Sequence, residues 1–286
     1  MVEKSGKLFV VSTPIGNKDD ITYRAVNVLS ACDIVVCEEN KEGAVTLRNI
    51  NLKKELIELN EQNEVERVPE IIEMIKSGKK VALISDAGTP VFADPGFHLV
   101  NSCIFHNLNI EVVPGVTSIM AALVRSGFSI DEFLFAGFLD RKEGERLNKL
   151  QMLAKENRTV VFLETPYRLN AILSSASKVM PNRKAYIGMN LTMPFETHHY
   201  GTFSELNAKF QNEKVKAEFV VVFEASGITP KQYSNDIGDK IREKYNKFDE
   251  NSSGRKFESK RFSDKKSFND DRFAKNKPMK SKDRFG

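Results

Sequence analysis

The 286-residue sequence has no long hydrophobic run. None of its apolar segments approaches the ~20 residues that a membrane-spanning helix needs. The opening stretch, MVEKSGKLFVVSTP, also lacks the extended apolar segment of a secretion signal. We therefore expect a protein with no membrane partner.

Cysteine is scarce, with only Cys32, Cys37 and Cys103 in the chain. Their spacing matches neither a disulfide framework nor a set of metal ligands. Free cysteine packs as a small hydrophobe, so we expect these thiols in the core. This usage fits the reduced compartment of the cytoplasm, and we predict no metal site.

Several catalytic signatures are also missing. The sequence has no Gly-x-Gly-x-x-Gly pattern, no lysine-containing Walker motif and no His-Glu-x-x-His pair. A dinucleotide fold, a P-loop nucleotide site and a zinc peptidase each depend on one of these motifs. The glycine-rich loops of this chain therefore predict something other than a phosphate cradle.

Charge is unevenly distributed along the chain. Residues 231–286 contain 17 Lys and Arg against 10 Asp and Glu, a net charge of +7. The whole chain carries +4, so residues 1–230 carry −3. The C-terminal segment has few aliphatic residues and intersperses phenylalanines among basic and polar ones. We predict that it is disordered, because it cannot bury enough apolar surface to offset its conformational entropy.

Before that segment, apolar strands alternate with amphipathic helices, which predicts an α/β protein. The length favours two domains, which we place at residues 1–118 and 119–230, with a basic tail at 231–286. Continuous Val/Ile/Leu runs in the first half predict a mostly parallel sheet covered on both faces. Its strands are expected at residues 7–12, 33–38, 80–85 and 110–115, and its helices at 22–31, 65–78, 96–107 and 116–127.

The second half predicts a mixed sheet, because its last three strands follow one another without long crossovers. Its strands are expected at residues 133–138, 158–165, 184–190, 196–203 and 217–225, and its helices at 146–157, 167–179 and 204–211.

Three loops that leave strands of the first half share an unusual composition. They are STPIGN (Ser12–Asn17), SDAGTPVFADPG (Ser85–Gly96) and PGVTS (Pro114–Ser118). Glycine lets a backbone approach a ligand closely, and proline fixes the form of a loop. Ligands of open α/β sheets bind beyond the carboxyl ends of the strands. A tight turn between strand and helix would explain the composition of one such loop. Three such loops after strands of the same sheet predict a pocket built largely from main chain.

The ordered motifs STPIGN with DDITYRA, ALISDAGTPVFADPG, VVPGVTS, FLFAGFL and RTVVFLETPYRL resemble the tetrapyrrole methylase superfamily over roughly residues 7–225. Within it, they look like the branch that methylates ribose 2′-oxygens of small-subunit ribosomal RNA. The resemblance implies two α/β domains, a donor site for S-adenosylmethionine in the cleft between them, and a homodimer. Methyl transfer is a direct displacement, so catalysis is expected to come mostly from positioning.

The resemblance also assigns a set of residues to donor binding. Backbone carbonyls and short side-chain oxygens suit the cationic sulfonium of the donor. For Asp86, a role as a turn cap is the alternative. The assigned residues are Pro14, Ser85, Asp86, Gly88, Thr89, Pro90, Ala93, Asp94, Thr117 and Ser118, with Thr192 and Ala217 from the second domain.

On the acceptor side the chain departs from the family. The acidic EDTR-like segment is EENK (Glu38–Lys41), HEHNE is NEQNE (Asn60–Glu64), and RELTK is MNLTM (Met189–Met193). Lost cations weaken phosphate contacts, and lost histidines remove candidate proton acceptors. The catalytic candidates that remain are Glu38, Glu61, Asn63 and Glu64, against the alternative that they are solvated loop residues. Arg168 either contacts RNA phosphate or caps its helix.

The sequence thus predicts an S-adenosylmethionine-dependent methyltransferase acting on the ribose of a cytidine in small-subunit ribosomal RNA, free or in the assembled subunit. One alternative is methylation of a tetrapyrrole or another small acceptor. Another is a catalytically silent RNA-binding relative. The basic, phenylalanine-containing tail suits RNA binding, with a solubilising extension as its alternative. With no obvious general base, we expect the hydroxyl proton to pass to water.

Overall fold

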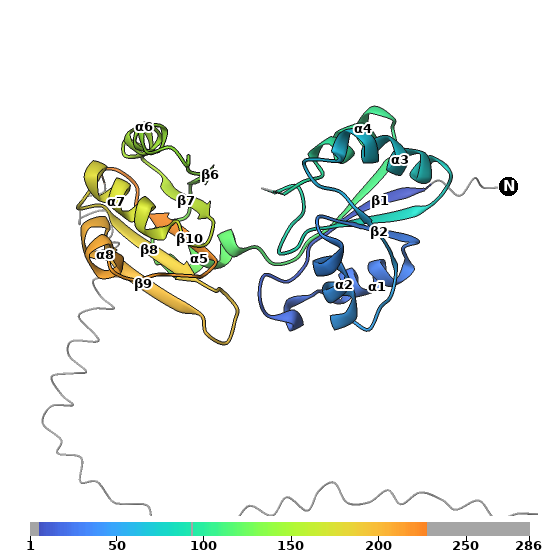
Figure 1. Cartoon of the computed structure of the whole chain (residues 1–286), viewed down its shortest axis with the longest axis horizontal. Coiled ribbons are helices and arrows are strands. Elements are labelled where there is room, and N and C mark those ends of the chain that lie inside the picture. Colours follow the sequence, from blue (N-terminus) through green and yellow to red (C-terminus); the bar gives the residue numbers. More distant parts are fainter. Residues whose placement is uncertain (1–5, 93, 228–286) are drawn as a thin grey trace, which may run out of the picture. The chain divides into compact units, whose positions relative to one another are not determined.

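The computed structural model describes residues 6–92 and 94–227, which form two five-stranded sheets with helices packed on them (Figure 1). Both sheets belong to one compact unit. Two parts of the sequence predictions, the tail at residues 231–286 and Ala93, lie outside the described residues.

The first sheet is parallel throughout, as the sequence predicted. Its strand order is β3 (Glu55–Glu58), β2 (Ile34–Cys37), β4 (Lys80–Ile84), β1 (Lys7–Val11), β5 (Asn109–Val113). Val11, the last residue of β1, is in register with Ile84 of β4 and Val113 of β5. The three glycine- and proline-containing loops therefore begin side by side at one edge of this sheet.

Alternation along these strands separates two cores. Leu8 and Val10 pack with α3 (Glu64–Lys76) and α4 (Phe97–Phe105). Val11, one residue on, packs on the opposite face with α1 (Tyr23–Ala31) and α2 (Asn40–Asn49). Figure 1 shows the two helix pairs on either side of the strands. Cys32, Cys37 and Cys103 are buried and free in these cores, which confirms their predicted packing role.

The second sheet is mixed, also as predicted. Only β6 and β7 run parallel, and the other neighbours are antiparallel. Its order is β6 (Phe133–Phe138), β7 (Thr159–Glu164), β10 (Phe219–Phe223), β8 (Lys184–Met189), β9 (Thr197–Thr202).

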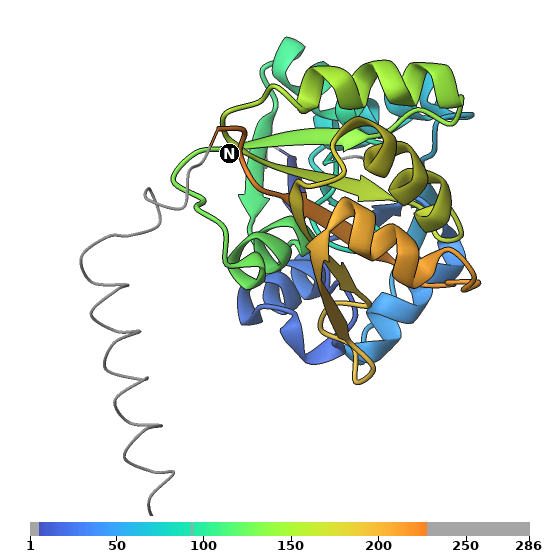
Figure 2. The same ribbon diagram turned by 90° about the vertical axis from the view of Figure 1, so that its left-hand side faces the viewer.

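Helices cover both faces of the second sheet. Three lie over one face, as Figure 2 shows: α6 (Glu143–Leu153), α7 (Leu169–Val179) and α8 (Phe203–Phe210). The other face packs against α5 (Ser118–Ser126) through Ile119, Ala122 and Leu123. The domain boundary predicted between residues 118 and 119 falls at the first residue of α5, and it stays a prediction.

Local sequence signals explain several helix ends. Thr117 caps α5 by accepting a hydrogen bond from the Ile119 backbone, and Gly127 ends that helix in a left-handed conformation. Thr202 and Glu205 form a reciprocal capping box at the start of α8.

Apart from a three-residue 3-10 helix, η1 (Lys18–Asp20), two elements were not predicted from the sequence. Helix α2 is mostly polar and contains Gly43, and β3 has only four residues at the sheet edge. Both are held by tertiary contacts. Gly43 lies so close to Cys37 that an added Cβ would come within 2.6 Å of its sulfur.

Candidate functional site

Two of the three loops are tied together by hydrogen bonds. Thr13 and Gly88 exchange backbone hydrogen bonds of 2.8 and 3.2 Å, and the Thr13 hydroxyl donates to the Ser85 carbonyl at 3.0 Å. The Ser12 and Thr89 hydroxyls lie 3.0 Å apart. The third loop approaches at Gly115, where an added Cβ would lie 2.7 Å from the Ser12 Cβ. The carboxyl edge of the first sheet is thus a tight frame with little room for larger side chains.

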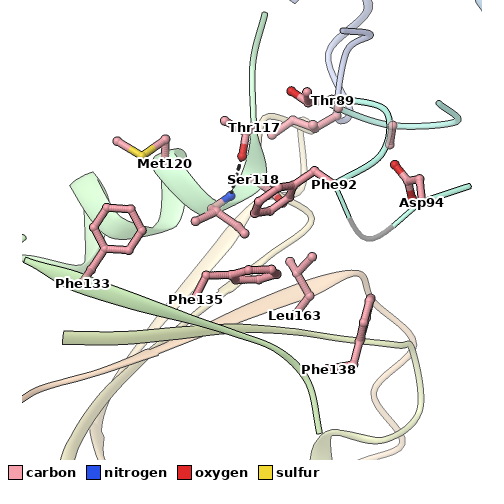
Figure 3. A pocket seen from close by; sticks show the side chains of 14 residues that line it. Thr89, Phe92, Asp94, Thr117, Ser118, Met120, Phe133, Phe135, Phe138 and Leu163 are labelled. Atoms are coloured by element: carbon pink, nitrogen blue, oxygen red, sulfur yellow. Dashed lines mark hydrogen bonds between the residues drawn. The ribbon is translucent and has the colours of Figure 1, made fainter. Parts of the chain in front are cut away.

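An aromatic cavity of about 370 Å³ opens beside this frame (Figure 3). Phe133, Phe135 and Phe138 of β6 line it together with Phe92 of the second loop. The Phe92 and Phe135 rings stack with centroids 4.6 Å apart. Gly88, Thr89, Thr117 and Ser118 complete a rim of small polar groups. Flat apolar rings fit a cavity of this kind.

An acidic cavity of about 300 Å³ adjoins the first. Four carboxylates line it: Asp86, Asp94, Glu164 and Glu218. Among the described residues, no Lys or Arg contributes to its wall. The two cavities share six lining residues: Ile15, Ala87, Asp94, Ser118, Phe138 and Leu163.

A smaller cavity of about 270 Å³ lies beside Asp86 and Pro14. It is lined by the first loop, by α2 and by Met193 from the second half. Among the described residues, Lys18 is the only lysine on its wall. Asp86 therefore lies between this cavity and the acidic one.

Burial strongly affects the carboxylates of the first half. Burial raises the pKa of Asp94 to about 6, and the neighbouring Glu38 and Asp86 carboxylates add to the effect. Burial also raises the pKa of Asp86, which accepts a hydrogen bond from the Glu39 backbone. One buried Asp86 oxygen, Oδ1, has no partner among the described residues. Such a cluster is disfavoured unless a positively charged or hydrogen-bond-donating ligand compensates it.

Glu164 ends β7 and supplies a carboxylate from the second half. The residue is 3% exposed, and burial raises its pKa. Its Oε1 accepts hydrogen bonds from Thr165 and lies 2.8 Å from Arg168 Nη1, while the buried Oε2 has no partner within the described part of the chain.

Arg168 is further occupied by the backbone carbonyls of Leu139 and Asp140. These partners engage the guanidinium within the fold. Arg168 is the N-cap residue of α7, but its side chain makes no capping hydrogen bond. Its contact with RNA phosphate stays a prediction.

The structure separates the four catalytic candidates. Glu38 is half-buried near Asp86, and burial raises its pKa. Asn63 closes its own loop by hydrogen bonds with Asn60 and Glu58. Glu64 accepts a hydrogen bond of 2.9 Å from the Gly96 backbone. Glu61 is exposed. None of the four lines the described aromatic or acidic cavity, so their catalytic roles stay predictions.

The predicted donor-binding residues are mostly brought together. Seven line the described cavities: Pro14, Asp86, Gly88, Thr89, Asp94, Thr117 and Ser118. Ser85 lies just behind the wall, and its hydroxyl donates to the Gly88 carbonyl. Pro90 and Ala217 are buried without lining these cavities. Thr192 accepts a 2.9 Å hydrogen bond from the Asn17 backbone, which links the first loop to the second half.

Sequence reasoning missed the contribution of the second sheet. Phe133, Phe135 and Glu164 lie within strands, where their pattern is that of core residues. Glu218 and Asn190, which also line the acidic cavity, adjoin β10 and β8. No local signal distinguishes the phenylalanines from core packing. Glu164 and Glu218, which adjoin apolar strands, carried a usable signal, because carboxylates are rarely buried there without a partner.

Two further observations concern the described ranges only. No three His, Cys, Asp or Glu side chains in residues 6–92 and 94–227 are arranged as ligands for a metal ion. In the same ranges, no helix combines the length and apolar character that crossing a bilayer requires.

A family model described as tetrapyrrole (corrin/porphyrin) methylases matches residues 7–207. The chain belongs to the tetrapyrrole methylase family. This confirms the resemblance drawn from the loop motifs. Members of the family are S-adenosylmethionine-dependent methyltransferases, and the protein is therefore an enzyme of this class.

Relatives within the family are similar over most of the chain. Ribosomal RNA small subunit methyltransferase I of Thermotoga maritima is 39% identical over 217 residues, covering 76% of this chain and 97% of the relative. The protein of the same name from Mesorhizobium japonicum is 42% identical over 200 residues, covering 70% and 68%.

A solved structure confirms the α/β fold. Diphthine synthase matches with a TM-score of 0.63 at 16% identity, covering 77% of this chain and 90% of that chain. At this identity the likeness bears on the fold alone.

The acidic cavity fits the methyl donor of the family. S-adenosylmethionine carries a sulfonium and an ammonium group, and two buried carboxylate oxygens in this region, Asp86 Oδ1 and Glu164 Oε2, have no partner in the described residues. Opposite charge would lower the raised pKa values of these groups. Asp86, Asp94, Glu164 and Glu218 are thus the side chains suited to hold it.

Proposed function

We propose that this protein methylates the ribose 2′-oxygen of a cytidine in small-subunit ribosomal RNA. The curated relatives at 39% and 42% identity are named ribosomal RNA small subunit methyltransferase I, which supports this acceptor class. The reaction would take place in the cytoplasm, on free ribosomal RNA or on the assembled small subunit.

The observation that carries the proposal is the pair of cavities with a shared wall. The acidic cavity suits the cationic donor, which supplies the methyl group when bound. The aromatic cavity suits a nucleobase taken out of its stack, because bases pack on aromatic side chains. An acceptor held there would present its ribose toward the shared wall, where the donor's methyl group has to be placed for in-line displacement.

The predicted donor-binding residues keep their assignment in this arrangement. Ser118 lines both cavities at the N-terminus of α5, a position that favours a negatively charged group such as the donor's carboxylate. Gly88, Thr89 and Thr117 adjoin the shared wall from the aromatic side.

We also propose a homodimer. The surface of α4 exposes Phe97, Ile104 and Phe105, of which Phe105 is 80% exposed. Clustered apolar side chains of this kind typically mark a protein–protein contact. Light scattering should give twice the mass of the 32.3 kDa chain, and Phe105→Glu should shift the mass toward one chain.

The test of the function is methyl transfer from labelled S-adenosylmethionine to small ribosomal subunits that lack this modification, followed by mapping of the labelled nucleotide. The expected result is label on the ribose 2′-oxygen of a cytidine. Label on a base would contradict the proposal that the ribose 2′-oxygen accepts the methyl group. No label, with the donor still bound in a calorimetric titration, would favour a small acceptor or a silent RNA-binding protein instead.

Free ribosomal RNA and assembled subunits should be compared in the same assay. If the basic tail attracts RNA, the affinity of the protein for RNA should fall as the salt concentration rises, because counterions return to the phosphates. A variant ending at residue 230 separates the contribution of the tail from that of the cavities.

A further inference from the structure

We propose that the side chain of Tyr167 is a stacking surface for an unpaired nucleobase next to the target nucleotide of the RNA. The inference rests on the proposed function and adds a substrate contact to it. Tyr167 lines none of the three described cavities, so its role is not explained by them.

Tyr167 occupies a strained backbone position. The Arg168 N–H donates to the Thr165 carbonyl at 3.4 Å and closes a four-residue turn, in which Pro166 and Tyr167 are the central residues. Tyr167 has a φ of +72°, in the left-handed region. A turn with proline second and a left-handed residue third normally has glycine or asparagine in the third place. A bulky side chain is unfavourable there, and such strain is concentrated at functional sites.

Packing within the fold does not account for this tyrosine. Tyr167 is 68% exposed, and neither a hydrogen bond nor a ring contact joins its side chain to another described residue. Asparagine or glycine would form the same turn without strain. A contact with another molecule therefore explains the aromatic ring better than a structural role does.

The turn follows directly on the wall that the two cavities share. Leu163 of β7 lines both cavities and is in register with Phe138 of β6, which also lines both (Figure 3). Glu164, the next residue, lines the acidic cavity. Tyr167 comes three residues later, beyond the carboxyl end of β7. The ring is thus placed beside the site proposed for the acceptor nucleotide.

Arg168 holds the turn against the loop that follows β6. Its guanidinium lies 2.8 Å from Glu164 Oε1 and donates to the backbone carbonyls of Leu139 and Asp140 at 3.0 and 2.9 Å. These bonds fix the base of the turn, although Tyr167 itself is exposed. A preorganised ring of this kind loses little conformational entropy when it binds a ligand.

The loop after β6 also brings positive charge to this region. Arg141 and Lys142 are exposed, and their side chains form no ion pair within the described residues. Residues 139–142 hold these two basic residues against one acidic residue, Asp140, a net charge of +1, and the following Glu143 is already paired with a lysine. An exposed ring beside unpaired cations fits single-stranded RNA, whose bases stack on aromatic side chains and whose phosphates attract cations.

The experiment compares wild type with Tyr167→Asn and Tyr167→Phe. Asparagine removes the ring and tolerates the left-handed conformation, so the turn is preserved. Phenylalanine keeps a ring and removes only the hydroxyl. Met152→Asn is the matched control, because Met152 is 67% exposed in the last turn of α6 and lines none of the described cavities.

Three quantities are measured for each variant. Methyl transfer to unmodified small subunits gives kcat and the KM for the subunit. Calorimetry gives the affinity for S-adenosylhomocysteine, and thermal unfolding gives Tm.

We expect Tyr167→Asn to raise the KM for the small subunit about 10-fold, within the range for loss of one base–aromatic stack. The kcat should stay within about twofold of wild type, because the ring binds ground state and transition state alike. Affinity for S-adenosylhomocysteine should not change, and Tm should not fall, since the lost ring is exposed and backbone strain is relieved. Tyr167→Phe and Met152→Asn should keep the wild-type KM.

A binding measurement identifies what the ring contacts. The probe is a protein-free ribosomal RNA fragment that contains the mapped nucleotide, titrated at several salt concentrations. Tyr167→Asn should weaken binding of this fragment by about 10-fold without changing the dependence on salt. Arg141→Gln should instead reduce the slope of log affinity against log salt concentration by about 1.

The outcomes separate this contact from the proposed function. A wild-type KM in Tyr167→Asn would overturn the contact alone, as would a lower Tm together with the raised KM, which would indicate a structural role. A Tyr167→Phe variant as impaired as Tyr167→Asn would assign the effect to the hydroxyl and contradict stacking. Weaker binding of subunits with unchanged binding of the RNA fragment would assign the ring to a ribosomal protein, again against the inference. Absence of 2′-O label with wild type would overturn the proposed function and this contact together.

Discussion

The first sheet supplies its site residues from loops, whereas the second supplies most of its own from strands. The loops after β1, β4 and β5 bring small polar groups and Asp86 and Asp94 to one edge. The second sheet brings Phe133 and Phe135 from within β6, and Glu164 from the end of β7. The difference follows from topology, because parallel strands end together at one edge and place their following loops there.

The two halves also differ in how their buried carboxylates are compensated. Burial raises the pKa of Glu38 and of Asp94, and neighbouring carboxylates of the first half, Asp86 among them, raise both further. Glu164 in the second half is partly compensated by Arg168 and the Thr165 backbone. Ionised Glu38 and Asp94 of the first half therefore lack a compensating cation among the described residues, and a bound cation should lower their pKa values.

The largest expected effect is on the free energy of unfolding, and it tests whether a carboxylate of the first half is uncompensated. The pKa of Asp94 is raised from 3.8 to about 6, so the folded protein holds a proton that the unfolded chain releases. Stability should fall as pH rises from about 4 through 6. Asp94→Asn should then stabilise the donor-free protein at pH 7.5 by at most about 3 kcal/mol.

Thermal unfolding across pH 4–8 checks this. The difference in Tm between Asp94→Asn and wild type should shrink toward pH 4, where both side chains are neutral. A difference in Tm that is the same at every pH would mean that folding does not raise the pKa of Asp94.

The second prediction concerns donor affinity. It compares variants of one carboxylate from each half. Asp86→Asn and Glu164→Gln should each weaken S-adenosylmethionine binding by about 10-fold, the scale of one hydrogen bond to a charged group. S-adenosylhomocysteine should lose less, because its sulfur is neutral.

Calorimetric titration of both ligands measures this difference. Glu143→Gln is the control, since Glu143 pairs with Lys178 on the surface. If only the Asp86 variant weakens binding, the acidic cavity belongs functionally to the first half alone.

A third prediction concerns the aromatic cavity. Phe92→Ala and Phe133→Ala remove one ring from each half, and neither residue lines the acidic cavity. Each should raise the KM for the small subunit by about 10-fold, because base stacking on an aromatic side chain contributes ~1–3 kcal/mol. Donor affinity should stay unchanged, and Met152→Ala, on the exposed side of α6, is the control. Weaker donor binding in both variants would place the donor in the aromatic cavity.

The last prediction concerns Glu64 and its effect on stability. Its Oε1 accepts a hydrogen bond from Gly96, at the end of the second loop. Glu64→Ala should destabilise the protein by about 1–2 kcal/mol, the scale of a lost, partly buried hydrogen bond. Glu64→Gln keeps the acceptor oxygen and should retain both stability and rate, as measured by urea unfolding and methyl transfer. A slow Glu64→Gln enzyme with normal stability would restore Glu64 as a catalytic candidate.

Much of the fold could be predicted from the sequence. Apolar runs and helical spacing indicated the parallel first sheet, the mixed second sheet and most of their helices. The signal was weak at α2 and β3. A polar helix with Gly43 and a four-residue edge strand are stabilised mainly by packing against neighbours, which no local pattern records.

The sequence by itself determined the loops, because their Gly, Pro, Ser, Thr and Asp residues sit where strands end and have few other uses. It also determined the family, through the order of those motifs. Only the tertiary structure decided which residues face the two cavities. Burial, and not residue type, distinguishes Asp94 from Glu61, and β6 phenylalanines become cavity residues because the loops of a distant segment, including Phe92, pack against them.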